Sequence, residues 1–163
     1  CTSQQMPYVA EKFKDYNSFA SSKLIDILPE DKIQDAVIYE IKSFESIILI
    51  NESGQLNKKS LPNEVQISPI KSILVSDVNS DGFKDIITVG NHYGVEVETT
   101  RYDAGFGAVL LGDGKINFQV VPAIESGFYV PHDSRNIQQL IINDKVFLLI
   151  ANNNSNLSLL SLN

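Results

Sequence analysis

The spacing of hydrophobic and polar positions in this 163-residue chain changes near residue 36. Before that point, apolar residues recur three or four positions apart with charged residues between them: Tyr8, Val9, Phe13, Tyr16, Phe19 and Ala20. This spacing predicts an amphipathic helix, and Pro7 is compatible with its first turn. A second short helix is predicted over 29–35, because Glu30 and Asp31 would lie in its first turn.

From residue 36 onward, short runs rich in β-branched residues alternate with turn residues. Strands are predicted over 36–39, 46–50, 70–75, 85–89, 108–111, 118–121, 137–142, 146–151 and 157–162. Tight turns are predicted at Asn51–Gly54, Gly112–Lys115 and Asn143–Asp144. Many short strands separated by turns indicate an all-β sandwich, barrel or propeller.

A weak internal repeat favours the propeller. Residues 47–56 and 109–118 each contain an apolar strand, a glycine-containing turn and the start of a second strand. Sequence repeats of about 20–50 residues are typical of propellers, and a long insertion over 91–107 lengthens the period here. We therefore expect a mainly β fold, a partial β-propeller preceded by a short helical segment.

The expected organisation has two parts. Residues 1–35 form the helical segment, and residues 36–163 form propeller blades. These blades are a partial blade at 36–61, a full blade at 70–121 that carries the insertion, and a last blade at 137–162. A propeller closes with about four to eight blades. We therefore expect the chain to be a fragment of a larger propeller, or a subunit whose sheets are completed by another chain.

Oxygen-bearing residues alternate through the segment 77–85. Asp77, Asn79 and Asp81 would supply side-chain oxygens, Phe83 its backbone carbonyl, and Asp85 a final carboxylate directly or through water. Ca²⁺ takes six to eight oxygen ligands. Gly82, inside the same segment, permits the sharp turn around an ion. The pattern therefore predicts a calcium-binding loop.

The same residues are compatible with two other kinds of loop. An EF-hand needs a glutamate at the twelfth position, which is Thr88 here, and it needs flanking helices rather than strands. The second alternative is an Asp- and Asn-rich turn that binds no metal, and the sequence leaves it open.

The loop between two apolar strands, followed by Gly112–Gly114 and Asn117–Phe118, resembles an FG-GAP or VCBS repeat. Such repeats are blades of integrin-α-like propellers. Further segments resemble the C-terminal end of long secreted repeat proteins of Bacteroidetes-type bacteria, often associated with ASPIC/UnbV domains: 90–94, 101–104, 110–114 and 125–128. The resemblance implies a calcium-stabilised module outside the cell or at its outer surface. Lys115–Asn117 departs from the usual glycine-rich hairpin ending, away from the metal loop.

Composition and charge restrict the partners. The formal net charge is −7, and such an acidic chain lacks the basic stripe that nucleic-acid binding requires. No apolar run reaches the ~20 residues of a membrane span. Cys1 is the single cysteine, so an internal disulfide is excluded. Two interpretations of Cys1 stay open: the lipid-bearing first residue of a bacterial lipoprotein, or a point where the sequence was cut.

No catalytic constellation is recognisable, so we expect the chain not to be an enzyme by itself. His92 and His132 lack a second ligand at metal-binding spacing, and Ser126 lacks the Gly-x-Ser-x-Gly motif of hydrolases. The insertion is a better candidate for contact with a protein or glycan partner, through Tyr93, Arg101, Tyr102 and Asp103. A structural Arg101–Asp103 pair that holds the loop is the competing interpretation.

The functional hypothesis is a calcium-binding, non-catalytic binding or assembly module. Its alternatives are an accessory segment of a larger secreted enzyme, and a purely structural calcium-clamped spacer.

Overall fold

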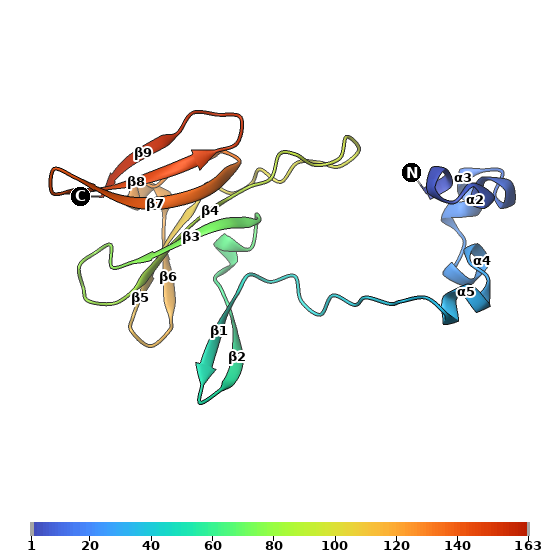
Figure 1. The fold of residues 1–163 in the computed structure, drawn as a ribbon, viewed down its shortest axis with the longest axis horizontal. Coiled ribbons are helices and arrows are strands. Elements are labelled where there is room, and N and C mark those ends of the chain that lie inside the picture. Colours follow the sequence, from blue (N-terminus) through green and yellow to red (C-terminus); the bar gives the residue numbers. More distant parts are fainter. Residues whose placement is uncertain (1, 163) are drawn as a thin grey trace. The chain divides into compact units, whose positions relative to one another are not determined.

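The computed structural model describes residues 2–162, and both interpretations of Cys1 lie outside them (Figure 1). Contacts divide the chain into two compact units, residues 1–43 (unit 1) and 44–163 (unit 2). None of the described helices is both long enough and apolar enough to cross a membrane.

Unit 1 is built of short helices in its described part. They are α1 (Thr2–Gln5), α2 (Pro7–Lys12), α3 (Tyr16–Ala20), α4 (Leu24–Ile27) and α5 (Glu30–Gln34). The prediction of one helix across 8–20 was wrong, because Asp15 begins a new helix. Its side chain accepts the Ser18 N–H at 2.8 Å, and this helix-capping geometry requires an extended backbone at Asp15.

The strand predicted over 36–39 was also wrong. Residues 36–39 belong to no strand, and Val37, Ile38 and Tyr39 are each more than three-quarters exposed. Their β-branched and aromatic composition favours a strand, but a strand forms only when a neighbouring strand completes its hydrogen bonds.

The described part of unit 2 contains three antiparallel sheets, so the mainly β prediction is confirmed. The first sheet pairs β1 (Ile47–Glu52) with β2 (Gln55–Ser60). The second has the order β3 (Ile70–Ser76), β4 (Asp85–Gly90), β5 (Ala108–Gly112) and β6 (Phe118–Val121). The third contains β7 (Ser134–Ile142), β8 (Lys145–Asn152) and β9 (Ser158–Leu162). Two short helices interrupt this pattern, η1 (Asn63–Val65) and α6 (Ala123–Ser126).

The predicted hairpin turns follow from backbone conformations that few residues adopt. Ser53 and Gly54 connect β1 to β2 with φ values of 54° and 91°. Asn143 and Asp144 connect β7 to β8 with φ values of 50° and 61°. Positive φ at both central residues is the geometry of a two-residue type I′ hairpin, which Asn, Asp and Gly tolerate best.

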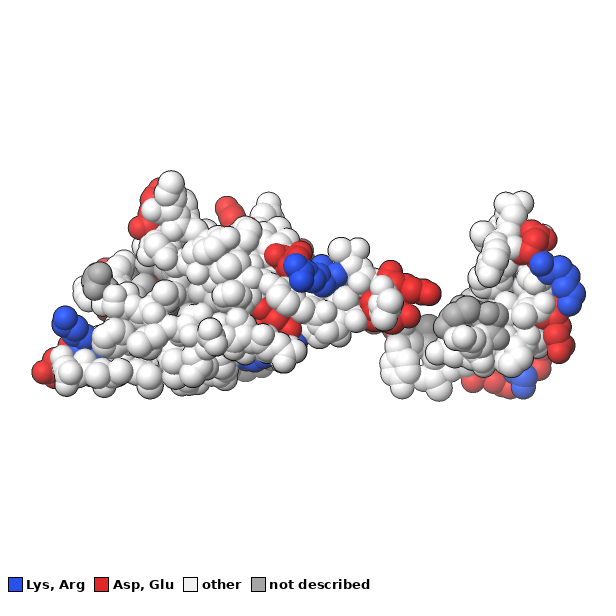
Figure 2. Space-filling view, turned by 90° about the horizontal axis from the view of Figure 1, so that it is seen from above, with Lys and Arg blue, Asp and Glu red and all other residues white. Residues whose placement is uncertain are grey.

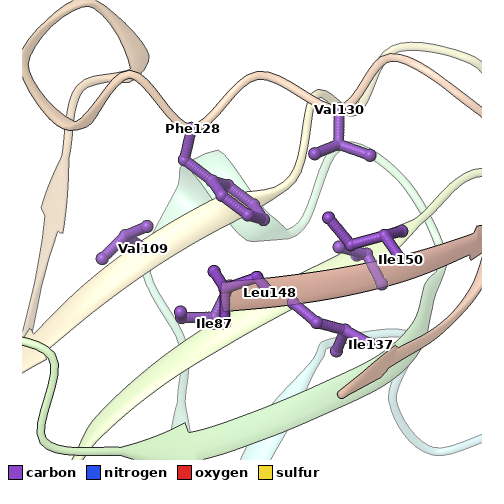
Figure 3. Packing of buried hydrophobic residues seen from close by; sticks show 8 residues of the cluster. Ile87, Val109, Phe128, Val130, Ile137, Leu148 and Ile150 are labelled. Atoms are coloured by element: carbon purple, nitrogen blue, oxygen red, sulfur yellow. The ribbon is translucent and has the colours of Figure 1, made fainter. Parts of the chain in front are cut away.

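Two hydrophobic clusters hold consecutive sheets together. The larger one, between the second and third sheets, consists of Ile87, Val89, Val109, Phe128, Val130, Ile137, Leu148 and Ile150 (Figure 3). The smaller one packs Leu61 and Val65, which follow β2, against Ala108 and Leu110 of β5. Strand β5 therefore contributes to both clusters, and β4 reaches the smaller one through the partly buried Ile86. The second sheet lies between the other two.

Candidate metal centre

The segment 77–85 connects β3 to β4, as the sequence predicted, and a strand rather than a helix follows it. This excludes the EF-hand interpretation. The backbone turns sharply at Ser80 and Gly82, whose φ values are 62° and 89°. Asn79 and Asp81 are exposed and Asp77 is half-buried, whereas Asp85 is completely buried.

Hydrogen bonds within the loop hold its side chains toward its own backbone. The two carboxylate oxygens of Asp77 accept the N–H groups of Asp81 at 3.2 Å and Gly82 at 2.9 Å. Asp81 in turn accepts the Phe83 N–H at 2.8 Å and the Asn79 amide at 2.8 Å. These hydrogen bonds therefore define the conformation of the loop without an ion.

Asp85 connects this loop to a distant hairpin. One of its oxygens accepts the Val78 N–H at 2.8 Å, inside the loop, and the other accepts the Gly112 N–H at 2.9 Å, at the end of β5. Charged acceptors make stronger hydrogen bonds than neutral ones, and burial increases the cost of losing them. Asp85 is therefore a structural tie as well as a candidate ligand.

The hairpin turn 113–117 packs directly on the candidate loop. A Cβ added to Gly114 would lie 2.4 Å from the Phe83 ring, and one added to Gly112 would lie 2.2 Å from the Lys84 carbonyl oxygen. On its other side the turn is held by Lys59 of β2, whose ammonium donates to the Ile116 carbonyl at 2.8 Å. Loop, turn and β2 therefore form one connected structure.

The donor chemistry of the loop fits calcium. Three carboxylates, one amide oxygen and one backbone carbonyl are hard oxygen donors, which Ca²⁺ prefers. Among residues 2–162, no three His, Cys, Asp or Glu side chains converge closely enough to hold an ion in their present positions.

The four residues predicted to contact a partner lie together at the base of the insertion. Arg101 pairs with Asp103 at 2.7 Å, and its guanidinium lies 4.6 Å from the centre of the Tyr93 ring. Tyr102 pairs through its backbone with His92, at 2.8 and 2.9 Å, and its side chain is half exposed. Within the insertion, Val95 and Val97 alternate with Glu96 and Glu98 as in a strand, but residues 95–98 belong to no strand, and residues 97 and 98 form a turn.

A buried polar cluster that the sequence did not suggest anchors this insertion. Asn91 and Asp133 are each 1% exposed. Asn91 donates to the carbonyls of Gly105 and His132, and Asp133 accepts the Tyr93 N–H at 3.3 Å. The Asp133 carboxylate also receives the Arg135 guanidinium at 2.7 Å. No periodic pattern in the sequence identifies these residues as buried, so the cluster can be recognised only from its contacts in the structure.

Three other residues were candidates for catalysis or metal binding in the sequence: Ser126, His132 and His92. The Ser126 hydroxyl donates to the Pro122 carbonyl and accepts the Phe128 N–H, so it joins α6 to the segment that follows it. The His132 carbonyl accepts hydrogen bonds from Asn91 and Ser134. The Nδ1 atom of His92 is buried and has no hydrogen-bond partner within the described structure.

Acid is expected to release the Asp133 anchor. Burial alone raises the pKa of Asp133, but the donors Arg135, Asn153 and Tyr93 outweigh burial and hold this pKa below its ordinary value. A carboxylate with a lowered folded-state pKa stabilises the fold above its unfolded pKa, about 3.9, and loses that contribution as pH falls through the folded value. The NMR chemical shift of the Tyr93 amide proton should therefore change with pH as Asp133 titrates, with a midpoint below the ordinary pKa of an aspartate.

Two variants test this assignment. In Asp133→Asn, the acid titration of the Tyr93 amide should disappear. Asp113→Asn is the matched control, because hydrogen bonds from Asn117 and Lys115 lower the pKa of Asp113 to about 2 at an exposed turn outside the insertion. A Tyr93 titration that persists in Asp133→Asn would show that another group controls this loop.

Comparisons of the chain with protein-family models, curated proteins and solved structures found no match. The fold and the loop still define a class of protein. The described residues form a mainly β protein with three consecutive antiparallel sheets and an acidic loop between two strands.

Proposed function

We propose that this chain is a calcium-binding, non-catalytic binding or assembly module built from propeller-type blades, which acts at the cell surface or outside the cell. The single observation that carries this proposal is the alternating set of oxygen donors from Asp77 to Asp85 at a strand-to-strand turn. The FG-GAP-like spacing of these donors supports the blade architecture, and so does the antiparallel sheet β3–β6 around them.

In this proposal calcium stabilises the structure and takes no part in catalysis. The side chains Asp77, Asn79, Asp81 and Asp85, with the Phe83 carbonyl, would hold the ion. Bound calcium would neutralise three carboxylates that repel one another when charged, and this favours the folded loop. Asp85 accepts the Gly112 N–H at the end of β5, and Phe83 lies against Gly114 in the 113–117 turn. The added stability would therefore extend to the contact between that turn and β2.

The surface is compatible with such a role. Figure 2 shows Asp and Glu side chains in scattered groups, with few Lys and Arg side chains between them. The partner, a protein or glycan, would contact the insertion through Tyr93, Arg101, Tyr102 and Asp103. The exposed guanidinium of Arg101 and ring of Tyr102 are the accessible parts of this group.

Calcium is expected to raise the melting temperature of the full chain. A ligand at about 100 times its Kd stabilises a protein by about 2.7 kcal/mol, which corresponds to a shift of roughly 10 °C for a unit of this size. Circular dichroism melts with calcium up to about 10 mM cover the affinities of extracellular calcium modules. Asp81→Ala should lose this shift, and magnesium should produce a smaller one. A melting temperature unchanged by calcium would contradict the proposal.

A further inference from the structure

A hollow of about 510 Å³ lies in unit 2, where residues 63–67 approach β5, β6 and α6. Its wall is mainly aliphatic and aromatic, formed by Ile67, Phe106, Val109, Val120, Val121 and Phe128. Ligand sites in proteins typically enclose about 300–1,000 Å³ and have mostly apolar walls. The hollow lies apart from the calcium loop and from the four predicted partner residues, none of which lines it.

Gly107 lets the backbone pass close to the Phe128 ring, and both residues line the hollow. Its φ of +75° is one that side-chain-bearing residues rarely adopt, and a Cβ there would lie 2.5 Å from the Phe128 ring. Phe128 is 5% exposed and belongs to the larger hydrophobic cluster, in which Figure 3 shows its ring above Ile87 and beside Val109. The wall is therefore held by the core and does not need to form when a ligand binds.

An apolar surface continues beyond the hollow. The Phe106 ring, which lines it, stacks on the ring of Tyr129 with 5.1 Å between the centroids. Both rings remain about half exposed. Exposed aromatic surface beside an apolar hollow often marks an interaction site.

The charge around the hollow is negative. Glu64 is the single charged residue among the described residues that line it. The described lining residues include no Lys or Arg. The Ser126 hydroxyl is engaged by Pro122 and Phe128, which leaves few polar groups to bind the hydroxyls of a sugar.

We infer that this hollow binds an apolar or aromatic side chain of a partner protein, in a segment that carries Lys or Arg beside it. The apolar wall accommodates the anchor side chain, and Glu64 pairs with the neighbouring cation. Buried apolar anchors provide most of the affinity at protein interfaces, while charges at the rim select the partner. The inference rests on the proposed binding role and is independent of the metal.

The test uses the full chain and three short peptides with the same Leu-Phe centre. The flanking residues are lysine in the first peptide, serine in the second and glutamate in the third. Two-dimensional NMR of the methyl groups of Val120 and Val121 reports occupancy of the hollow. We expect the lysine peptide to bind best and the glutamate peptide worst. Glu64→Gln should weaken the lysine peptide by about two- to fivefold, the size of an exposed charge pair.

Matched variants separate the hollow from its surroundings. Glu125→Gln should leave lysine-peptide binding unchanged, because Glu125 does not line the hollow. Ala123→Trp should abolish binding by filling the hollow, whereas Ile124→Trp, at an exposed neighbouring position, should not. Equal binding of the three peptides, or binding that survives Ala123→Trp, would overturn the inference, and so would a preference for a neutral oligosaccharide. The calcium-dependent shift in melting temperature is a separate measurement. Its absence would contradict the metal proposal and would leave the peptide-binding result unchanged.

Discussion

Replacing Asp85 by alanine should destabilise the metal-free protein by roughly 3–5 kcal/mol. The substitution removes a completely buried carboxylate that accepts the N–H groups of Val78 and Gly112. Each buried donor left without a partner costs about 1–3 kcal/mol, and bonds to a charged acceptor lie at the upper end. Urea denaturation in the presence of a calcium chelator measures this loss; circular dichroism suits the experiment because the chain contains no tryptophan.

Asp81→Ala is the matched control for this experiment. Asp81 is an exposed member of the same candidate ligand set, so its loss should cost less than about 1 kcal/mol without calcium. Both variants should lose calcium binding, measured by titration calorimetry. Equal stability of the two variants in chelator would show that Asp85 does not tie the loop to the hairpin. Calcium binding retained by both would remove the loop as the metal site.

Replacing Gly112 by alanine should destabilise the protein by about 3 kcal/mol. The added methyl group would lie 2.2 Å from the Lys84 carbonyl oxygen, which belongs to backbone and cannot rotate away. Overpacking of this kind costs about 1–3 kcal/mol, and a backbone neighbour places the cost at the upper end. The shift should also move the Gly112 N–H away from Asp85 and weaken calcium binding. Urea denaturation and calorimetry measure the two effects.

Gly94→Ala provides the comparison for that substitution. A Cβ at residue 94 would meet its nearest neighbour, the His92 ring, at an ordinary contact distance of 3.8 Å. Gly94→Ala should therefore change stability by less than about 0.5 kcal/mol, as most surface substitutions do. If the two variants were equally stable, the hairpin would not be packed tightly against Lys84.

The amino-acid sequence by itself determined the local features of this protein. The alternating donors and the glycine of the segment 77–85 placed an acidic turn between two strands, where the structure has it. The Asn143–Asp144 turn and the strands on either side of it were predictable for the same reason. Such features depend on backbone preferences and hydrogen bonds within a few residues, and these are written directly in the residue types.

Local composition was insufficient to predict secondary structure where a segment needs a neighbouring strand, or where one side chain caps a helix. Residues 36–39 have strand composition but belong to no strand. The helical spacing over 8–20 was interrupted because Asp15 caps a new helix, a hydrogen bond that competes with continuation of the helix. In both cases the local pattern of residue types was real, but interactions beyond it decided the backbone conformation.

Only the tertiary structure decided how the candidate sites are held. Asp85 meets Gly112 across 27 positions of sequence, and Asp133 meets the Tyr93 N–H across 40. The hollow beside Glu64 likewise exists because residues 63–67 pack near β5, β6 and α6. These contacts follow from which sheets stack and in which register. That arrangement is set by the sum of many long-range apolar contacts, and no pattern within a short stretch of sequence specifies it.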